Sequence, residues 1–128
     1  MKIMALDYGS KRVGVASTDE TGHFALPRMV LANNEELLEK VLEFKMKEGI
    51  DEIVMGESHN LDGTPNAIMK EIENFKNQLE EKGMQVVLHP EVFSTMEARQ
   101  IQGNNELTDA SAAAIILKSF LDSNGNQV

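Results

Sequence analysis

The chain has 128 residues, with 12 Lys or Arg against 21 Asp or Glu, which gives a net charge of −9 at pH 7. That length suits a single domain, and the lack of cysteine excludes disulfides, thiolate metal sites and a cysteine nucleophile. The acidity excludes nucleic-acid binding by overall charge, so such a partner would require bridging cations or a local basic patch. The N-terminal segment resembles no signal peptide and no apolar run reaches the ~18 residues of a membrane span. We therefore expect a cytoplasmic protein without membrane contact.

The first third of the chain predicts three strands. Residues 2–7 form an apolar run that ends in Asp7, as expected of a central strand buried on both faces. A turn over 8–11 leads into the second strand. Pro27 removes a ladder donor from the third strand and so favours an edge position. The expected strands are 2–7, 12–18 and 24–31.

Helices and strands alternate in the rest of the chain. Asn33 with Glu36 forms a capping box that predicts a helix from there to Gly49. Thr64, followed by proline, predicts the start of a second long helix that ends at Gly83, and Thr108 is the expected cap of a final helix. Strands over 50–55 and 84–89 and a short helix over 94–102 complete the expected elements.

This order predicts an α/β fold: a mixed five-stranded sheet, three antiparallel strands followed by parallel ones, with helices on both faces. We expect one domain over residues 1–122 and a flexible polar tail over 123–128. In such sheets, ligands bind beyond the carboxyl ends of the strands, where the strand order reverses. The acids that close the parallel strands are Asp7, Glu57 and Glu91, and they form the candidate site.

Carboxylates that a fold brings together repel one another unless a cation lies between them. Magnesium takes oxygen ligands from one or two carboxylates, and two divalent ions about 3.5–4 Å apart can activate water and stabilise the leaving oxygen in phosphodiester cleavage. Each acid also has a purely structural interpretation. Asp7 can form a turn, Asp109 can stabilise a helix N-terminus, and Glu91 can be solvated.

Four stretches support the catalytic interpretation when they are taken together. They are DYGSKRVGVA (7–16), NLDGT (60–64), EVFSTMEA (91–98) and DASAAAIIL (109–117). In order and spacing they resemble the motifs of the Holliday-junction-resolvase-like family often written YqgF. Members of that family are also described as pre-16S rRNA nucleases with a ribonuclease H-like fold. The resemblance covers nearly the whole chain.

The resemblance implies that Asp7, Glu91 and Asp109 are the catalytic acids and the ligands of Mg²⁺ or Mn²⁺, with Asp7 bridging two ions. Gly9 permits a tight turn and close approach of a phosphate. The expected substrate-binding residues are Gly9, Lys11, Arg12, Asn60 and Thr95. The implied partner is structured RNA such as pre-rRNA, or branched DNA, bound by a monomer or a weak homodimer.

The chain departs from the family pattern at two places near the candidate site. Val92 stands where the family has an arginine beside the active-site glutamate. Glu57, Ser58 and His59 replace a proline-containing stretch, so Glu57 is a further candidate metal ligand, while His59 is expected to be an ordinary loop histidine.

Three functions remain open at this point. The first is a two-metal-ion endonuclease, a hydrolase of ester bonds, that processes the 5′ end of pre-16S rRNA or resolves Holliday junctions. The second is a catalytically weak or inactive module on the same fold that binds RNA or protein, which the lost arginine motivates. The third and most remote is an actin-like ATP-binding domain, because Asp7, Gly9 and Gly14 also fit that phosphate loop.

Overall fold

The computed structural model describes residues 1–57, 67–90 and 106–125, and side chains within the last range from 110 to 123. The predicted start at Thr64 and the predicted short helix over 94–102 lie outside these ranges. The strands are β1 (Ile3–Tyr8), β2 (Arg12–Thr18), β3 (Ala25–Ala32), β4 (Glu52–Glu57) and β5 (Val86–Pro90), and the helices are α1 (Leu37–Glu48), α2 (Ile68–Glu81) and α4 (Glu106–Gly125). No described helix is long and apolar enough to span a membrane.

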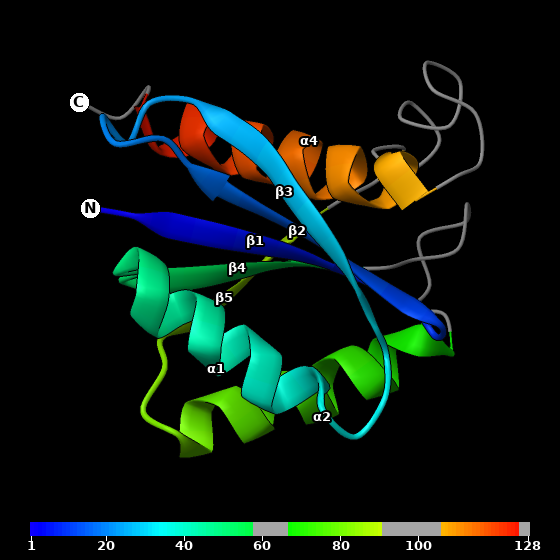
Figure 1. The fold of residues 1–128 in the computed structure, drawn as a ribbon. Helices are drawn as coiled ribbons and strands as arrows, with labels where there is room; N and C mark the ends of the chain where they lie inside the picture. The colour runs from blue at the N-terminus through cyan, green and yellow to red at the C-terminus, as the bar shows by residue number, and fades with distance from the viewer. Residues whose placement is uncertain (58–66, 91–105, 126–128) are drawn as a thin grey trace.

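The strands form one five-stranded sheet in the order β3-β2-β1-β4-β5. Strand β2 pairs antiparallel with both β1 and β3, whereas β1, β4 and β5 run parallel. Helices α1 and α2 cover one face and α4 covers the other (Figure 1). The predicted mixed sheet with helices on both faces is confirmed, as are the central first strand and the edge position of the strand that carries Pro27.

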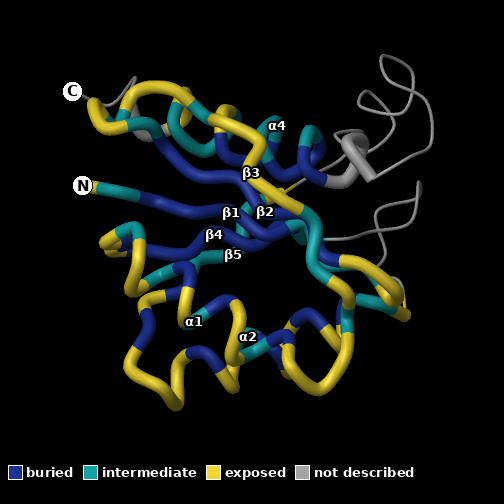
Figure 2. The backbone as a smooth tube through the Cα atoms, in the orientation of Figure 1, coloured by how far each residue is buried: buried dark blue, intermediate teal, exposed yellow. Residues whose placement is uncertain are grey.

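Strand β1 supplies both hydrophobic cores because successive side chains point to opposite faces of a sheet. Met4 and Leu6 pack in the core under α1 and α2, while Ala5 packs in the core under α4. All three are completely buried, and the central strands appear as the dark interior of Figure 2. Continuing the alternation, Asp7 belongs to the α4 face and Tyr8 to the α1 and α2 face. Tyr8 indeed packs against the core under those two helices.

The predicted cap of the first helix is wrong. Helix α1 begins at Leu37, and its N-cap residue Glu36 makes no side-chain capping bond. Instead, the Asn34 Oδ1 atom accepts a hydrogen bond of 2.9 Å from the Glu36 backbone N–H. The Asn33 side chain is directed to the turn after β1, where it donates to the Gly9 carbonyl. The C-terminal end is as predicted, since Gly49 has a left-handed backbone with φ of 68°.

The final helix also differs from its prediction at both ends. Helix α4 begins at Glu106, so Thr108 lies within its first turn and is not the cap. The helix continues to Gly125 and therefore includes the first three residues of the predicted tail, 123–125. Ile116 on this helix is fully buried against the sheet.

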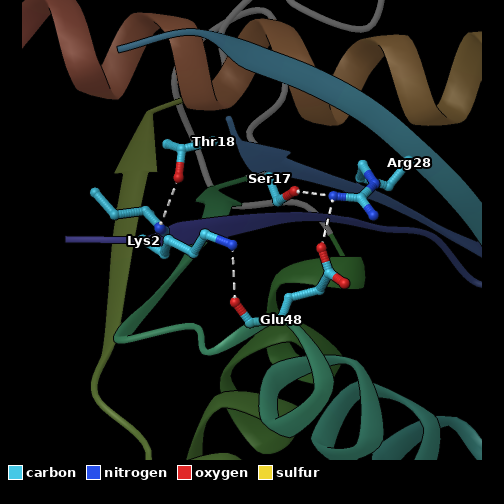
Figure 3. A network of polar contacts seen from close by, with 6 residues as sticks. Lys2, Ser17, Thr18, Arg28 and Glu48 are labelled. Carbon is cyan, nitrogen blue, oxygen red and sulfur yellow. Dashed lines mark hydrogen bonds and ion pairs between the residues drawn. The ribbon is translucent and has the colours of Figure 1, made fainter. Parts of the chain in front are cut away.

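A polar network ties the edge strand β3 to the end of α1 (Figure 3). The Arg28 guanidinium donates to Ser17 Oγ at 2.9 Å, pairs with a Glu48 carboxylate oxygen at 3.0 Å and lies 5.3 Å from the centroid of the Phe44 ring. Lys2 Nζ donates to the Glu48 carbonyl at 3.1 Å. The network therefore fixes the end of the sheet where β1 begins, remote from Asp7.

Replacing Arg28 by alanine is expected to lower the free energy of unfolding by about 1–2 kcal/mol, because a hydrogen bond, an ion pair and a cation–π contact are lost together. Urea denaturation measures the change. Lys40→Ala is the matched control, since the exposed Lys40–Glu36 pair should contribute about 0.5 kcal/mol or less. Equal effects of the two substitutions would contradict the role assigned to Arg28.

Candidate active site

Asp7 lies near the carboxyl end of the central strand, half-buried and on the face that α4 covers. Its partner across the ladder to β2 is Gly14, and continuing the register with β4 by one residue places Gly56 on its other side. Both neighbours lack a side chain. The positions beside Asp7 on the two neighbouring strands therefore place no side chain next to its carboxylate.

The parallel strands end at the same edge as β1. Glu57 closes β4 and is paired with Pro90, the last residue of β5. Glu91 follows Pro90 directly in the sequence but lies outside the described residues, as do Asn60 and Thr95. The structure thus establishes the sheet edge on which the predicted acids were placed.

Helix α4 runs antiparallel to β1, so its N-terminal end lies toward the end of the sheet that carries Asp7 (Figure 1). Ala113 packs in the same core as Ala5. Four residues back along a helix cover about 6 Å, which matches two residues forward along a strand. Moving back along α4 from Ala113 to Asp109 therefore covers about the same distance as moving forward along β1 from Ala5 to Asp7. The backbone of Asp109 is described, but its side chain is not.

The turn after Asp7 is built around Gly9. Its backbone N–H donates to the Arg12 carbonyl at 2.9 Å, which closes the link between β1 and β2. A Cβ atom on Gly9 would lie 2.7 Å from that same carbonyl oxygen, closer than real Cβ atoms come. Only glycine therefore fits this turn. Lys11 and Arg12 are both exposed beside it and supply positive charge next to the acidic strand end.

Asn33 holds this turn from the end of β3. Its side-chain Nδ2 donates to the Gly9 carbonyl at 2.7 Å, and its backbone N–H donates to the Lys11 carbonyl at 2.9 Å. Sequence reasoning missed this role because an asparagine three residues before a glutamate is also typical of a helix cap. The turn that bears the predicted phosphate contacts is thus fixed at both ends.

Glu57 has a different orientation from Asp7. By alternation along β4 it falls on the same face as Met55, which packs in the core under α1 and α2. Asp7 belongs to the opposite face, but the Glu57 carboxylate also acts on His89, which packs against α4 on the face of Asp7, so Glu57 stays a predicted ligand. Among the side chains that the structure describes, no three His, Asp or Glu residues gather into a metal site. The two other predicted ligands are not among those side chains.

His89 is the one described histidine at this end of the parallel strands. Its Nε2 lies 2.9 Å from Ser119 Oγ, and its ring meets Phe120 edge-on with centroids 5.8 Å apart. Burial lowers the pKa of His89, while the nearby Glu57 carboxylate opposes this by raising it. The neutral ring is therefore the form that the fold favours.

The lowered pKa of His89 predicts a pH-dependent loss of stability. The contribution of His89 to the free energy of unfolding is complete above the pKa of about 6.5 that histidine has in the unfolded chain. It is lost as the pH falls below that value, because protonation then favours the unfolded chain. His89→Gln keeps a hydrogen-bonding group near Ser119 but removes the titration. Urea denaturation at pH 7.5 and about 5.5 should show a smaller decrease in the variant than in the wild type. Identical decreases would refute this assignment.

Comparison with known proteins supplies the family. The family model described as "RuvX: Holliday junction resolvase" matches residues 1–123. The chain belongs to this family. A relative in Lawsonia intracellularis, named "Putative pre-16S rRNA nuclease", is 34% identical over 95% of this chain and 94% of its own. One with the same name in Geobacillus thermodenitrificans is 35% identical over 96% of this chain and 99% of its own.

Solved structures show the fold of the RuvX chain to be that of the RuvC-like resolvases, which is ribonuclease H-like. Thermus thermophilus RuvC in complex with a Holliday junction substrate matches with a TM-score of 0.61 and 15% identity over 98% of this chain and 96% of that one. The fowlpox virus resolvase bound to Holliday junction DNA matches with a TM-score of 0.61 and 13% identity over 97% and 99% of the two chains. The predicted family and fold are both confirmed.

Proposed function

We propose that this RuvX chain is an endonuclease that hydrolyses phosphodiester bonds at the carboxyl edge of its parallel strands. Asp7, Glu91 and Asp109 are the proposed catalytic acids, with Mg²⁺ or Mn²⁺ as the proposed cofactor. The observation that carries the proposal is the setting of Asp7, which ends the central strand with glycines on both neighbouring strands. Glycine inside a strand is typical of a place where a ligand approaches the backbone closely, which supports a site for an ion and a phosphate beside Asp7.

The donor set fits a hard divalent cation. All three proposed ligands are carboxylates, and Mg²⁺ binds through one or two carboxylates together with water and phosphate oxygens. When bound, such ions would polarise the phosphodiester and offset the charge that develops on its attacking and leaving oxygens. The net charge of −9 makes this role important, because the chain as a whole repels a nucleic acid.

The protein's own groups would place the scissile phosphate. Gly9 lets the backbone of the turn approach closely, and Asn33 keeps that turn in one conformation through its bond to the Gly9 carbonyl. The exposed Lys11 and Arg12 give the local positive charge that a phosphate needs on an otherwise acidic surface. Val92 leaves the site without the arginine of the family motif, so these two cations would carry more of the phosphate binding.

The names of the relatives favour RNA over DNA. The curated relatives at 34–35% identity are named for pre-16S rRNA, whereas the resolvases with bound junctions share only 13–15% identity and support the fold alone. We therefore propose structured RNA at the 5′ end of pre-16S rRNA as the first substrate, and branched DNA as the second. A resolvase would require two active sites and thus a dimer, whereas RNA trimming would not.

The test is a cleavage assay with purified protein on two labelled substrates: an RNA that spans the 5′ processing site of pre-16S rRNA, and a four-way DNA junction. Each is incubated with Mg²⁺, Mn²⁺ or EDTA. We expect discrete RNA products with either ion and none with EDTA. Binding of both substrates without cleavage in any metal would instead support a non-catalytic module, and ATP binding by calorimetry would support the actin-like alternative.

A further inference from the structure

A hollow lies on the face of the sheet that α1 and α2 cover, at the same end as Asp7. It has a volume of about 650 Å³ and is formed between the start of α1, the exposed side of α2 and the last residue of β1. We call it the amide pocket because three carboxamide side chains line it beside two aromatic rings. The carboxamides are Asn33, Asn74 and Gln78, and the rings are Tyr8 and Phe75. Pockets for small organic ligands have volumes of about 300–1,000 Å³.

The lining of the amide pocket combines aromatic rings with carboxamides. Tyr8 and Phe75 meet with ring centroids 5.5 Å apart and planes inclined by 41°. Asn74 and Gln78 project from successive turns of α2 and are exposed, and neither side chain makes a hydrogen bond within the described parts of the chain. An amide can donate and accept at once, so such a pair can satisfy the edge of a nucleobase.

The charge of the amide pocket favours the base of a nucleotide over its phosphate. Its only described ionisable lining residues besides Tyr8 are Glu35 and Glu71, which are both acidic and exposed. Two carboxylates repel a phosphate, but they accept hydrogen bonds from the amino and imino groups of a base. The pocket therefore suits an uncharged base, in contrast to the Gly9 turn with its two cations.

The amide pocket lies next to the proposed active site, on the other face of the sheet. Tyr8 follows Asp7 on β1 and points to the opposite face, so the end of a single strand separates the two. Asn33 belongs to both, because it lines the pocket and donates to the Gly9 carbonyl at 2.7 Å. A nucleic-acid strand whose phosphate lies at the Gly9 turn would pass this strand end on its way to the pocket.

We infer that the amide pocket binds an unpaired nucleobase of the substrate, next to the nucleotide whose phosphate is cleaved. The position relative to the cut rests on the proposed function, but binding of the base does not. The inference explains why the side of α2 that faces Tyr8 carries carboxamides and carboxylates while the cations lie on the turn. It also predicts that the enzyme requires a single-stranded or unstacked nucleotide beside the scissile bond.

The first test measures base binding without any cleavage. Adenosine, guanosine, cytidine and uridine are titrated separately into ¹⁵N-labelled protein, with inorganic phosphate as a further probe, and side-chain amide resonances are followed by NMR. At least one nucleoside should shift the amides of Asn74 and Gln78, and phosphate should not. Asn77 is the internal control, since it lies on the same helix outside the pocket. Absence of shifts with every nucleoside, or shifts with phosphate alone, would overturn the inference.

The second test uses the cleavage reaction. The double variant Asn74→Ala/Gln78→Ala should raise KM about tenfold and leave kcat within twofold, because two hydrogen bonds to bound substrate are lost. Asn77→Ala should behave as the wild type. A substrate with an abasic nucleotide at the flanking position should remove the difference between variant and wild type. If the wild type cleaves nothing, the proposed function fails, and the nucleoside titration still decides whether the pocket binds a base.

Discussion

Replacement of Asp7 by asparagine is expected to abolish metal-dependent cleavage, with a decrease in rate of about a thousandfold or more. Asparagine has nearly the same shape but lacks the negative charge that holds a divalent cation. Stabilisation of the reacting charge by such ions is worth several kcal/mol, and each 1.4 kcal/mol corresponds to a tenfold change in rate. Single-turnover cleavage of the labelled RNA in Mg²⁺ measures the decrease.

The fold should tolerate this substitution, which separates loss of chemistry from loss of structure. Asp7 is half-buried at the end of its strand, between glycines, so an isosteric amide disturbs little packing. The thermal midpoint of Asp7→Asn should therefore be close to that of the wild type. Asp122→Asn is the matched control, because Asp122 is exposed near the far end of α4. Full activity of Asp7→Asn, in a preparation free of contaminating nuclease, would exclude the proposed site.

Gly9→Ala should have the second largest effect, on both activity and stability. The added Cβ would lie 2.7 Å from the Arg12 carbonyl oxygen, a backbone atom that cannot move without distorting the turn. Forcing extra volume into a packed position typically costs about 1–3 kcal/mol. A displacement of about 1 Å in a positioning element can lower the rate about a hundredfold. Urea denaturation and the RNA cleavage assay measure the two effects.

The control for Gly9→Ala is its neighbour in the same turn. Ser10 is exposed, so Ser10→Ala should change stability by less than about 0.5 kcal/mol and leave cleavage nearly unchanged. If Gly9→Ala is as stable and as active as Ser10→Ala, then the close approach at the Arg12 carbonyl has no functional role. A second substitution at Asn33 should not restore the Gly9→Ala variant, because the clash with the Arg12 carbonyl lies within the turn itself.

The architecture of this protein was predictable because its signals are local and strong. Apolar runs identified all five strands, and the second matched its predicted range of 12–18 to the residue. The apolar stretch before Asp7 placed that strand in the centre, since a strand with neighbours on both sides and helices on both faces buries apolar side chains on both of its faces. Pro27 marked the edge for an equally local reason, its missing N–H.

Predictions failed where a residue serves a partner distant in the sequence. Asn33 fits a helix cap by its local pattern, but its side chain bonds the Gly9 carbonyl 24 residues earlier. A local sequence pattern cannot show that the Asn33 side chain bonds this distant carbonyl instead of capping the helix. The same limit applied to the amide pocket, which exists only because α1 and α2 pack side by side at the end of β1. It also applied to the glycines beside Asp7, which depend on strand register.

The candidate site was only partly predictable from the residues themselves. Asp7 follows from the end of a central strand and Gly9 from the chemistry of a tight turn. The end of a parallel strand made Glu91 a candidate, but its catalytic role, and the choice of Asp109, came only from the resemblance to a family, because a solvated glutamate or an aspartate in the first turn of a helix is ordinary by itself. Both remain proposals, together with Asn60 and Thr95.

A crystal structure of the wild-type protein soaked in Mn²⁺ tests the central claim most directly, because the anomalous signal of manganese marks its position independently of the protein atoms. The account predicts at least one anomalous peak within about 2–2.5 Å of the Asp7 carboxylate, with oxygens of Glu91 or Asp109 completing its ligands. Clear density for the three acids pointing apart, or paired with lysines and arginines and without a manganese peak, would contradict it.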